Sequence, residues 1–327
     1  MDLIRHVRGP AFARPRLLPL AAPGATAARI AVERFVRDRH WTIAGSAAAA
    51  DVLVEIGVRT ADLSHVADVL GGQLPAPSTR VAVADDGEVT ARLAAVPGLL
   101  EADHGDRDHG DRDHSGRELE LPMADRAEDR DGLKLDVLRV PLGPALPHWP
   151  AGLRLDVTLQ GDVIQRAGAD VLGLAQGVTS FWLPGERVAA RRLDAAAHLI
   201  DVAGWHAMAA RCRLLRDRVL TGQWGFALAH DIARAGARIE RSRLLRAGLR
   251  GVGEVAGVDA AGRLRRWLAQ AANPAGPTPP GPGAEEAVER LPGLVTGTEI
   301  AVARLAVASM DLDLAELAVP TTAARDG

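Results

Sequence analysis

A strict alternation of apolar and polar side chains over residues 153–160 constrains this chain more than any other stretch. Leucine or valine occupies every odd position, and Arg, Asp, Thr or Gln occupies every even one. This is the period of a strand with one buried face. Gly161 and Asp162 follow, and a glycine that tolerates positive φ suits a two-residue hairpin turn. A Pro- and Gly-rich loop over residues 143–152 leads into the strand, so we predict a rigid, pocket-lining loop followed by a β-hairpin.

Strands and helices alternate through the first 100 residues. Alternation of this kind predicts a small parallel sheet with helical crossovers. An apolar stretch near the start resembles a signal peptide, but Pro19 and Pro23 interrupt it, and we expect a buried first strand instead. The apolar runs predict strands at 16–20, 51–57 and 79–84, and the amphipathic stretches predict helices at 25–39, 60–74 and 88–96.

Residues 101–131 have a different composition. The sequence HGDRD occurs twice, a third histidine follows, and apolar side chains are almost absent. A segment that cannot bury a core is predicted to be a solvated, disordered linker. His104, His109 and His114 are candidate ligands for a loosely held divalent metal, but they lie too far apart for one rigid site. The favoured interpretation is a linker without an ordered metal.

The chain is predicted to be mainly helical from residue 187 onward. We therefore expect an α/β domain with a small parallel sheet over residues 1–100, the linker over 101–131, and an α+β domain with a β-hairpin and a mainly helical core over 132–327. The helical stretches that the pattern predicts are 191–220, 226–249, 260–272, 285–291 and 299–317.

Three clusters in the helical part suggest a function, and each also has a plainer interpretation. Asp194, His198 and Asp201 share one helical face, which suits a metal or, more commonly, a paired polar surface. Cys212 stands between arginines that would lower its pKa, yet no resolving cysteine or base accompanies it, so a packed thiol is favoured. The arginines between residues 234 and 250 suit phosphates, an acidic partner, or salt bridges in a subunit interface.

Composition excludes several classes of function. A net charge of −3 at pH 7 gives no reason to expect nucleic-acid binding. The single cysteine cannot form an intrachain disulfide, a zinc ribbon or an all-cysteine iron–sulfur cluster, and it indicates a reducing compartment. No uncharged apolar run approaches the ~20 residues that are needed to cross a bilayer. We therefore expect a cytoplasmic chain without a transmembrane segment.

One region resembles a subunit of the hydrogenase-like core of respiratory complex I. Residues 50–83 are similar to the small, iron–sulfur subunit of complex I and of membrane-bound nickel–iron hydrogenases. That subunit has a strand, a helix, and a Met-Pro-x-Pro turn before the next strand. Residues 74–77, LPAP, would be that turn.

The predicted hairpin resembles another part of the same complex, the large quinone-site subunit of NADH-quinone oxidoreductase. Gly143, Pro144 and Pro147 match its G-P-x-H-P-x-x-H-G loop, and the strand around Arg154 and the Gly161 turn match the hairpin that follows. The sequence ASMD at residues 308–311 is similar to a G-S-x-D segment near the end of that large subunit. The two resemblances follow one another as if the small and large subunits were fused.

The departures from the family concern its chemistry. Leu146 and Pro150 occupy the positions of the two loop histidines, and His148 lies between them. The chain has no tyrosine, whereas the family's quinone pocket uses one, and the cluster cysteines are absent. A histidine and a tyrosine can hydrogen-bond a quinone and deliver protons to it, whereas a leucine and a proline cannot.

The resemblance implies a degenerate chain that is not catalytic alone. The expected function is a structural or assembly component of a membrane-associated NADH-quinone oxidoreductase or a related redox complex, on the inner face of the cell membrane, with other subunits of that complex as partners. The family would imply an iron–sulfur cluster, nickel–iron or quinone, and we expect this chain alone to bind none of them. One alternative is a quinone-pocket subunit that receives electrons from a partner; another is a stand-alone binding protein with a metal-buffering linker. The quinone-loop-like residues are Gly143, Pro144, Pro147, His148 and Arg154.

Overall fold

The N-terminal domain is a four-stranded sheet with helices on both faces. The computed structural model describes residues 13–107, 125–128, 134–182, 187–276 and 283–318. The sheet has the order β2-β1-β3-β4 and all its pairs are parallel, as predicted. Two helices, α2 and α4, cover one face, and α3 covers the other. The elements are β1 Arg16–Ala21, α2 Thr26–Asp38, β2 Thr42–Ile43, β3 Val52–Ile56, α3 Ala61–Gly71, β4 Thr79–Val83, α4 Val89–Ala94 and α5 Val96–Arg107.

The first part of the predicted linker is helical. Helix α5 continues to Arg107, so the prediction of disorder is wrong for residues 101–107. Residues 125–128 form the short strand β5, which also contradicts a structureless linker. Buried Val96 and Leu100 anchor α5 in the N-terminal core, and helix formation then extends through the polar residues that follow. His109 and His114 lie outside the described residues.

A second sheet is antiparallel and contains the predicted hairpin. Its order is β5-β6-β7-β8, with β5 Asp125–Glu128, β6 Lys134–Leu142, β7 Leu153–Gln160 and β8 Val163–Val171. The alternating leucines and valine of β7 are all buried, and Gly161 takes φ +64° in the turn, as predicted. The buried face packs on α11 Ala284–Val295 and α12 Ile300–Ala308.

Three predicted helical stretches are each divided in the structure. One of them, 299–317, becomes α12 and a short 3-10 helix at Leu314–Ala318. The stretch 191–220 becomes α6 Val188–Val202 and α7 His206–Leu220, because Gly204 turns with φ +86°. The stretch 226–249 becomes α8 Phe226–Arg241 and α9 Arg243–Leu249. Extended Ser242 separates these two helices, and its hydroxyl accepts from Leu245 N, which is an N-cap. Helix α10 Ala260–Ala272 matches its predicted bounds.

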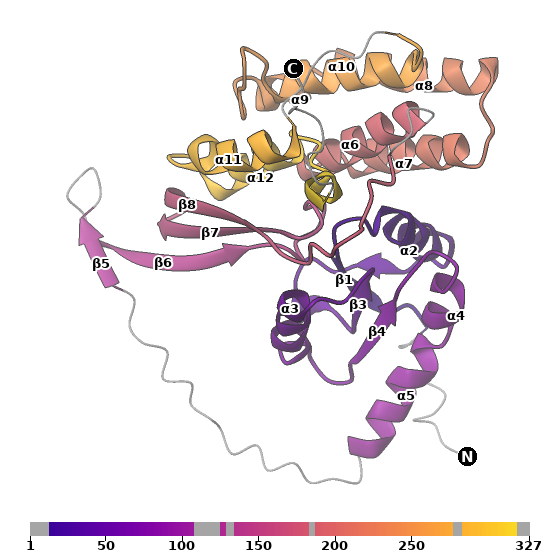
Figure 1. Cartoon of the computed structure of the whole chain (residues 1–327), viewed down its shortest axis with the longest axis vertical. Helices are drawn as coiled ribbons and strands as arrows, with labels where there is room; N and C mark the ends of the chain where they lie inside the picture. The colour runs from indigo at the N-terminus through magenta and orange to yellow at the C-terminus, as the bar shows by residue number, and fades with distance from the viewer. Residues whose placement is uncertain (1–12, 108–124, 129–133, 183–186, 277–282, 319–327) are drawn as a thin grey trace, which may run out of the picture.

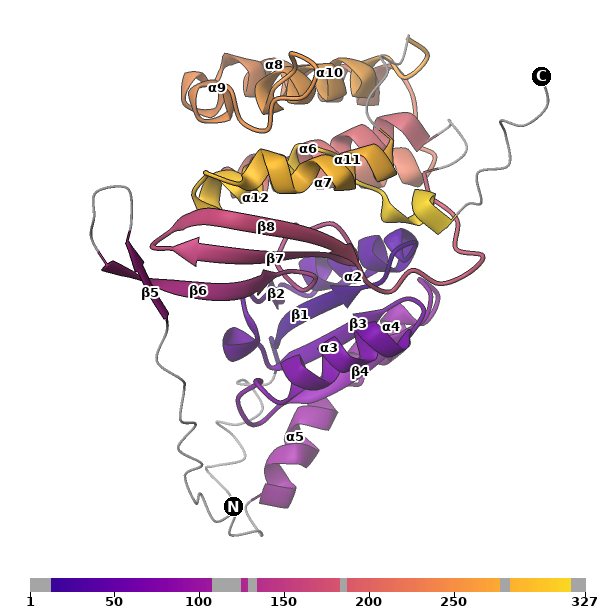
Figure 2. The ribbon, with the colours of Figure 1, turned by 60° about the vertical axis from the view of Figure 1, so that its left-hand side comes forward.

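The elements are stacked so that the two sheets lie near each other and the helices extend away from them. The hairpin sheet lies beside the N-terminal domain, the helices α6, α7, α11 and α12 lie beyond it, and α8, α9 and α10 form the outermost layer (Figures 1 and 2). Within the described residues, no helix has the length and apolar character needed to cross a membrane. The N-terminal domain meets the loop before β7 and helix α6 around one cavity.

Candidate functional site

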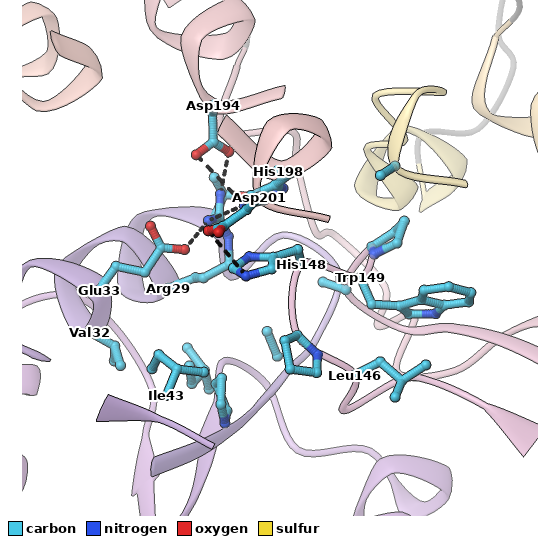
Figure 3. Close-up of a pocket in the computed structure, with 18 of the residues that line it drawn as sticks. Arg29, Val32, Glu33, Ile43, Leu146, His148, Trp149, Asp194, His198 and Asp201 are labelled. Atoms are coloured by element: carbon cyan, nitrogen blue, oxygen red, sulfur yellow. Dashed lines mark hydrogen bonds and ion pairs between the residues drawn. The ribbon is translucent and has the colours of Figure 1, made fainter. Parts of the chain in front are cut away.

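A cavity of about 420 Å³ lies where the N-terminal domain meets the hairpin and helical domain (Figure 3). Its apolar lining includes Val32 of α2, Ile43 of β2, and Pro144 and Leu146 of the loop before β7. Its polar lining comes mainly from α2 and α6. The volume falls within the range of roughly 300–1,000 Å³ that is typical of small-molecule sites.

The loop before β7 has the rigid form that its sequence predicts. Gly143 takes φ +85° and packs against Trp149, which is buried. The indole Nε1–H of Trp149 donates to Leu153 O at 2.8 Å and so ties the loop to the start of β7. His148 takes a left-handed conformation at φ +61° and lines the cavity, together with Pro147. The loop therefore presents three prolines, Pro144, Pro147 and Pro150, and its histidine to the pocket.

Arg154, by contrast, does not line the cavity. Its guanidinium is 2.7 Å from Asp156 Oδ2 and 3.4 Å from Asp170 Oδ2, on the polar face of the hairpin sheet. Gly143 is also absent from the cavity wall and acts by shaping the loop. Of the five quinone-loop-like residues, the structure brings together Pro144, Pro147 and His148.

The helical face predicted from Asp194, His198 and Asp201 points toward the N-terminal domain, where Arg29 meets it (Figure 3). Arg29 of α2 donates to Asp194 Oδ2 at 2.6 Å. Arg216 of α7 is fully buried and contacts both Asp194 and Glu33, the latter at 2.8 Å. The face is a buried ion-pair surface, and the described residues hold no group of three or more side chains arranged to bind a metal ion.

The carboxylates of this network are ionised. Burial works against the charge of Asp194, but Arg29, His198 and Arg216 outweigh it and hold the pKa of Asp194 well below its usual range. Burial likewise opposes the charge of Glu33, and Arg29 and Arg216 again lower its pKa strongly. The two carboxylates therefore act as fixed negative partners of the arginines.

His148 is held neutral and oriented by two charged neighbours. Its Nδ1 accepts from Arg213 at 3.0 Å, and its Nε2 lies 3.2 Å from Asp201 Oδ2. This arrangement assigns the ring proton to Nε2. Burial and the positive charge of Arg213 lower the pKa of His148 to about 4. Both ring nitrogens are thus occupied by protein partners.

His198 is also neutral, but only one of its ring nitrogens is engaged. Its Nε2 lies 3.3 Å from Arg29 Nη1, so that nitrogen accepts and the ring proton belongs on Nδ1. Burial lowers the pKa of His198 to about 3, and nearby Arg29 acts in the same direction. Nδ1 makes no hydrogen bond within the described part of the chain, and the side chain lines the cavity. A ligand carbonyl could accept from it.

The residues present do not fit an iron–sulfur cluster or a nickel–iron centre. Cys212 is the only cysteine; it is buried within the helical core, and burial raises the pKa of its thiol to about 12. A protonated, enclosed thiol is a packing residue, as the sequence favoured. Nothing is described of the His104 side chain, so the proposed metal-buffering linker receives no structural support.

Sequence reasoning identified the loop and the α6 face but missed the side chains that join them. Of these side chains, Arg29 and Glu33 could have been identified from the sequence, because they are spaced i,i+4 on the predicted first helix and form an ion pair there. No local spacing identifies Arg213 and Arg216, since carboxylates that they pair with lie on other elements. No protein-family model and no curated protein matches this chain.

Proposed function

We propose that this chain is a cofactor-free subunit of a membrane-associated redox complex of the complex I or hydrogenase type, and that its pocket binds the headgroup of a quinone. One observation supports this above others: a cavity of about 420 Å³ lies between the two halves that resemble the small and large subunits, against the quinone-loop-like residues. Pro144, Pro147 and His148 supply its wall there.

The chemistry of the wall suits a flat, mostly apolar ring with polar edges. Prolines and the side chains of Trp41, Trp149 and Trp182 provide apolar surface around the cavity. The Nδ1–H of neutral His198 is a donor available to a quinone carbonyl oxygen. Electrons must come from a partner subunit, because the only cysteine is protonated and enclosed.

Binding is tested with the purified chain and a short-chain quinone, read by quenching of tryptophan fluorescence. Three of the six tryptophans line the cavity, so a bound quinone should quench them. His198→Phe keeps a flat ring but removes the donor, and we expect about tenfold weaker binding, the value of one hydrogen bond. His230→Phe, on the exposed side of α8, is the matched control and should bind as the parent does. Absence of saturable quenching in the parent protein would reject the proposal.

A purely structural or assembly role is the second candidate, and the ion-pair network favours it. Three carboxylates at the domain contact, Glu33, Asp194 and Asp201, are already paired with arginine, as expected of a surface that holds two domains together. A tagged chain recovered from solubilised membranes should then bring membrane subunits with it even when His198→Phe has removed quinone binding. An iron–sulfur EPR signal, or quinone reduction by the chain alone, would contradict both candidates.

A further inference from the structure

The outermost helices α8 and α9 carry a concentration of positive charge that the pocket does not use. Residues 226–250 contain six arginines against two acids, whereas the whole chain has a net charge of −3. We call these arginines the α8–α9 basic face. Its members are Arg234, Arg238, Arg241, Arg243, Arg246 and Arg250, and all six are exposed.

The basic face is unpaired within the described residues. None of its six side chains makes an ion pair or hydrogen bond with another described residue, so salt bridges within the described part of the chain do not account for these arginines. Asp231, the acid nearest to Arg234, already pairs with Arg218 at 2.8 Å. Arginines of this kind offer their guanidinium donors to external anions, and the planar fork suits phosphate oxygens.

A hollow of about 670 Å³ lies among α8, α9 and α10, next to this charge. Arg241, Arg246 and Arg250 line it together with Arg265 of α10, and its floor is apolar, with buried leucines such as Leu245. Glu240 and Asp259 are its acidic members, and Asp259 is occupied as the N-cap of α10. Guanidinium groups around an apolar floor suit an anion that carries a hydrocarbon part.

Large apolar side chains project from the same two helices. Phe226 at the start of α8 is 91% exposed, and Leu244 on α9 is 86% exposed. By helical periodicity, Phe226, Arg234 and Arg241 lie within about 80° of one another on the solvent side of α8. An aromatic residue followed by arginines on one helical face is typical of helices that lie in a membrane interface. An acidic protein or a nucleic acid would give the exposed Phe226 and Leu244 no comparable apolar environment.

We propose that the α8–α9 basic face docks on a bilayer that contains anionic phospholipids. The arginines bind headgroup phosphates, and Phe226 and Leu244 enter the boundary between headgroups and acyl chains. Docking is independent of what the cavity between the domains binds, because the two sites share no residue. Quinone binding is measured without vesicles, and vesicle binding is measured without quinone. A negative result in one experiment therefore leaves the other proposal standing.

The test is flotation of the full chain with vesicles of phosphatidylcholine that contain about 30 mol% phosphatidylglycerol, against vesicles of phosphatidylcholine alone. We expect binding to the anionic vesicles only, and a marked loss at about 0.5 M salt. The variant R234Q/R238Q/R241Q should reduce partitioning about 100-fold, since each arginine near an anionic surface contributes about fivefold. F226S/L244S should reduce it about tenfold without changing the charge.

The matched control is R14Q/R139Q/R166Q, which removes the same charge from exposed arginines elsewhere on the molecule. It should bind within twofold of the parent chain. Equal binding to both kinds of vesicle, an unchanged α8 triple variant, or an equal loss in the control would each overturn the proposal. If the face instead receives an acidic protein or a nucleic acid, the chain will not float with vesicles of either composition, which would overturn it as well.

Discussion

Arg216 on α7 and Glu33 on α2 lie 183 positions apart in the chain, yet Arg216 Nη1 is 2.8 Å from Glu33 Oε2. The arginine has no exposed surface, and it also contacts Asp194 of α6 and, at 2.9 Å, Asp217. A buried cation therefore joins the N-terminal domain to two helices of the C-terminal domain. This contact is one of those that hold the two sides of the cavity together.

Replacing Arg216 with methionine should destabilise the protein strongly. The change leaves Glu33 and Asp194 buried with one cation fewer, and breaking such a pair from one side costs about 3–5 kcal/mol. The free energy of unfolding from urea titration measures the loss. Arg290→Met is the matched control, because its ion pair with Glu286 is half exposed on α11 and should contribute less than about 1 kcal/mol. Equal losses in the two variants would contradict a special role for Arg216.

The two pocket histidines should make the protein acid-sensitive. The pKa values of His148 and His198 are lowered to about 4 and about 3 in the folded chain, against about 6.5 when unfolded. At a pH between the folded and unfolded pKa values, the unfolded state binds more protons than the folded state. The free energy of unfolding is therefore highest above pH 6.5 and falls as the pH is lowered.

The free energy of unfolding should change by up to about 2.7 kcal/mol per pH unit near pH 5, because two protons are taken up on unfolding. Urea titrations between pH 7 and pH 4.5 measure it. His148→Gln combined with His198→Gln should flatten the profile, and exposed His230→Gln should not. A double variant with the parent's slope would show that the acid sensitivity arises elsewhere.

Much of the fold follows from local pattern. The alternation in β7, the glycine turn at Gly161 and the strand–helix repeat of the first domain are properties of neighbouring residues, and the structure confirms them. The errors are also local. Gly204 and Ser242 interrupt stretches that keep a helical apolar period on both sides, so periodicity alone did not reveal the breaks.

The site could be predicted only in part, because its geometry depends on pairing between distant elements. His148 and the α6 face were identifiable as polar groups in suitable contexts. Arg213 and Asp201 occupy both ring nitrogens of His148, whereas Nδ1 of His198 has no partner among the described residues. This difference depends on contacts between α2, α6, α7 and the loop before β7. No sequence period encodes such contacts.

The two faces of the hairpin should respond differently to truncation. Leu155 has no exposed surface and packs in the core beneath the hairpin sheet, so Leu155→Ala should cost about 2–5 kcal/mol through lost contacts and a cavity. Arg154, its neighbour, lies on the polar face, so Arg154→Ala should change stability by less than about 1 kcal/mol. Arg154→Ala should also leave quinone quenching unchanged; a large loss of quenching would show that this arginine reaches the cavity after all.

Gly143 should be sensitive to substitution, because both its backbone and its surroundings exclude a side chain. It takes φ +85°, and an added Cβ would lie 2.2 Å from Trp149 Nε1 and 2.4 Å from Leu153 O. Neither neighbour can move freely, since the Trp149 indole donates to that same carbonyl. Gly143→Ala should therefore cost the left-handed strain of about 1–2 kcal/mol and, in addition, a steric penalty and a displaced loop.

Gly177→Ala separates these two effects. Gly177 has a similar φ of +76°, but nothing lies within 4 Å of an added Cβ, so only the backbone strain should appear. Urea titration gives the two losses, and quinone quenching reports whether the loop still lines the cavity. We expect Gly143→Ala to lose clearly more stability than Gly177→Ala and to weaken quinone binding as well. Equal losses, with quenching intact, would mean that the loop can shift around an added methyl group and that its rigidity does not shape the pocket.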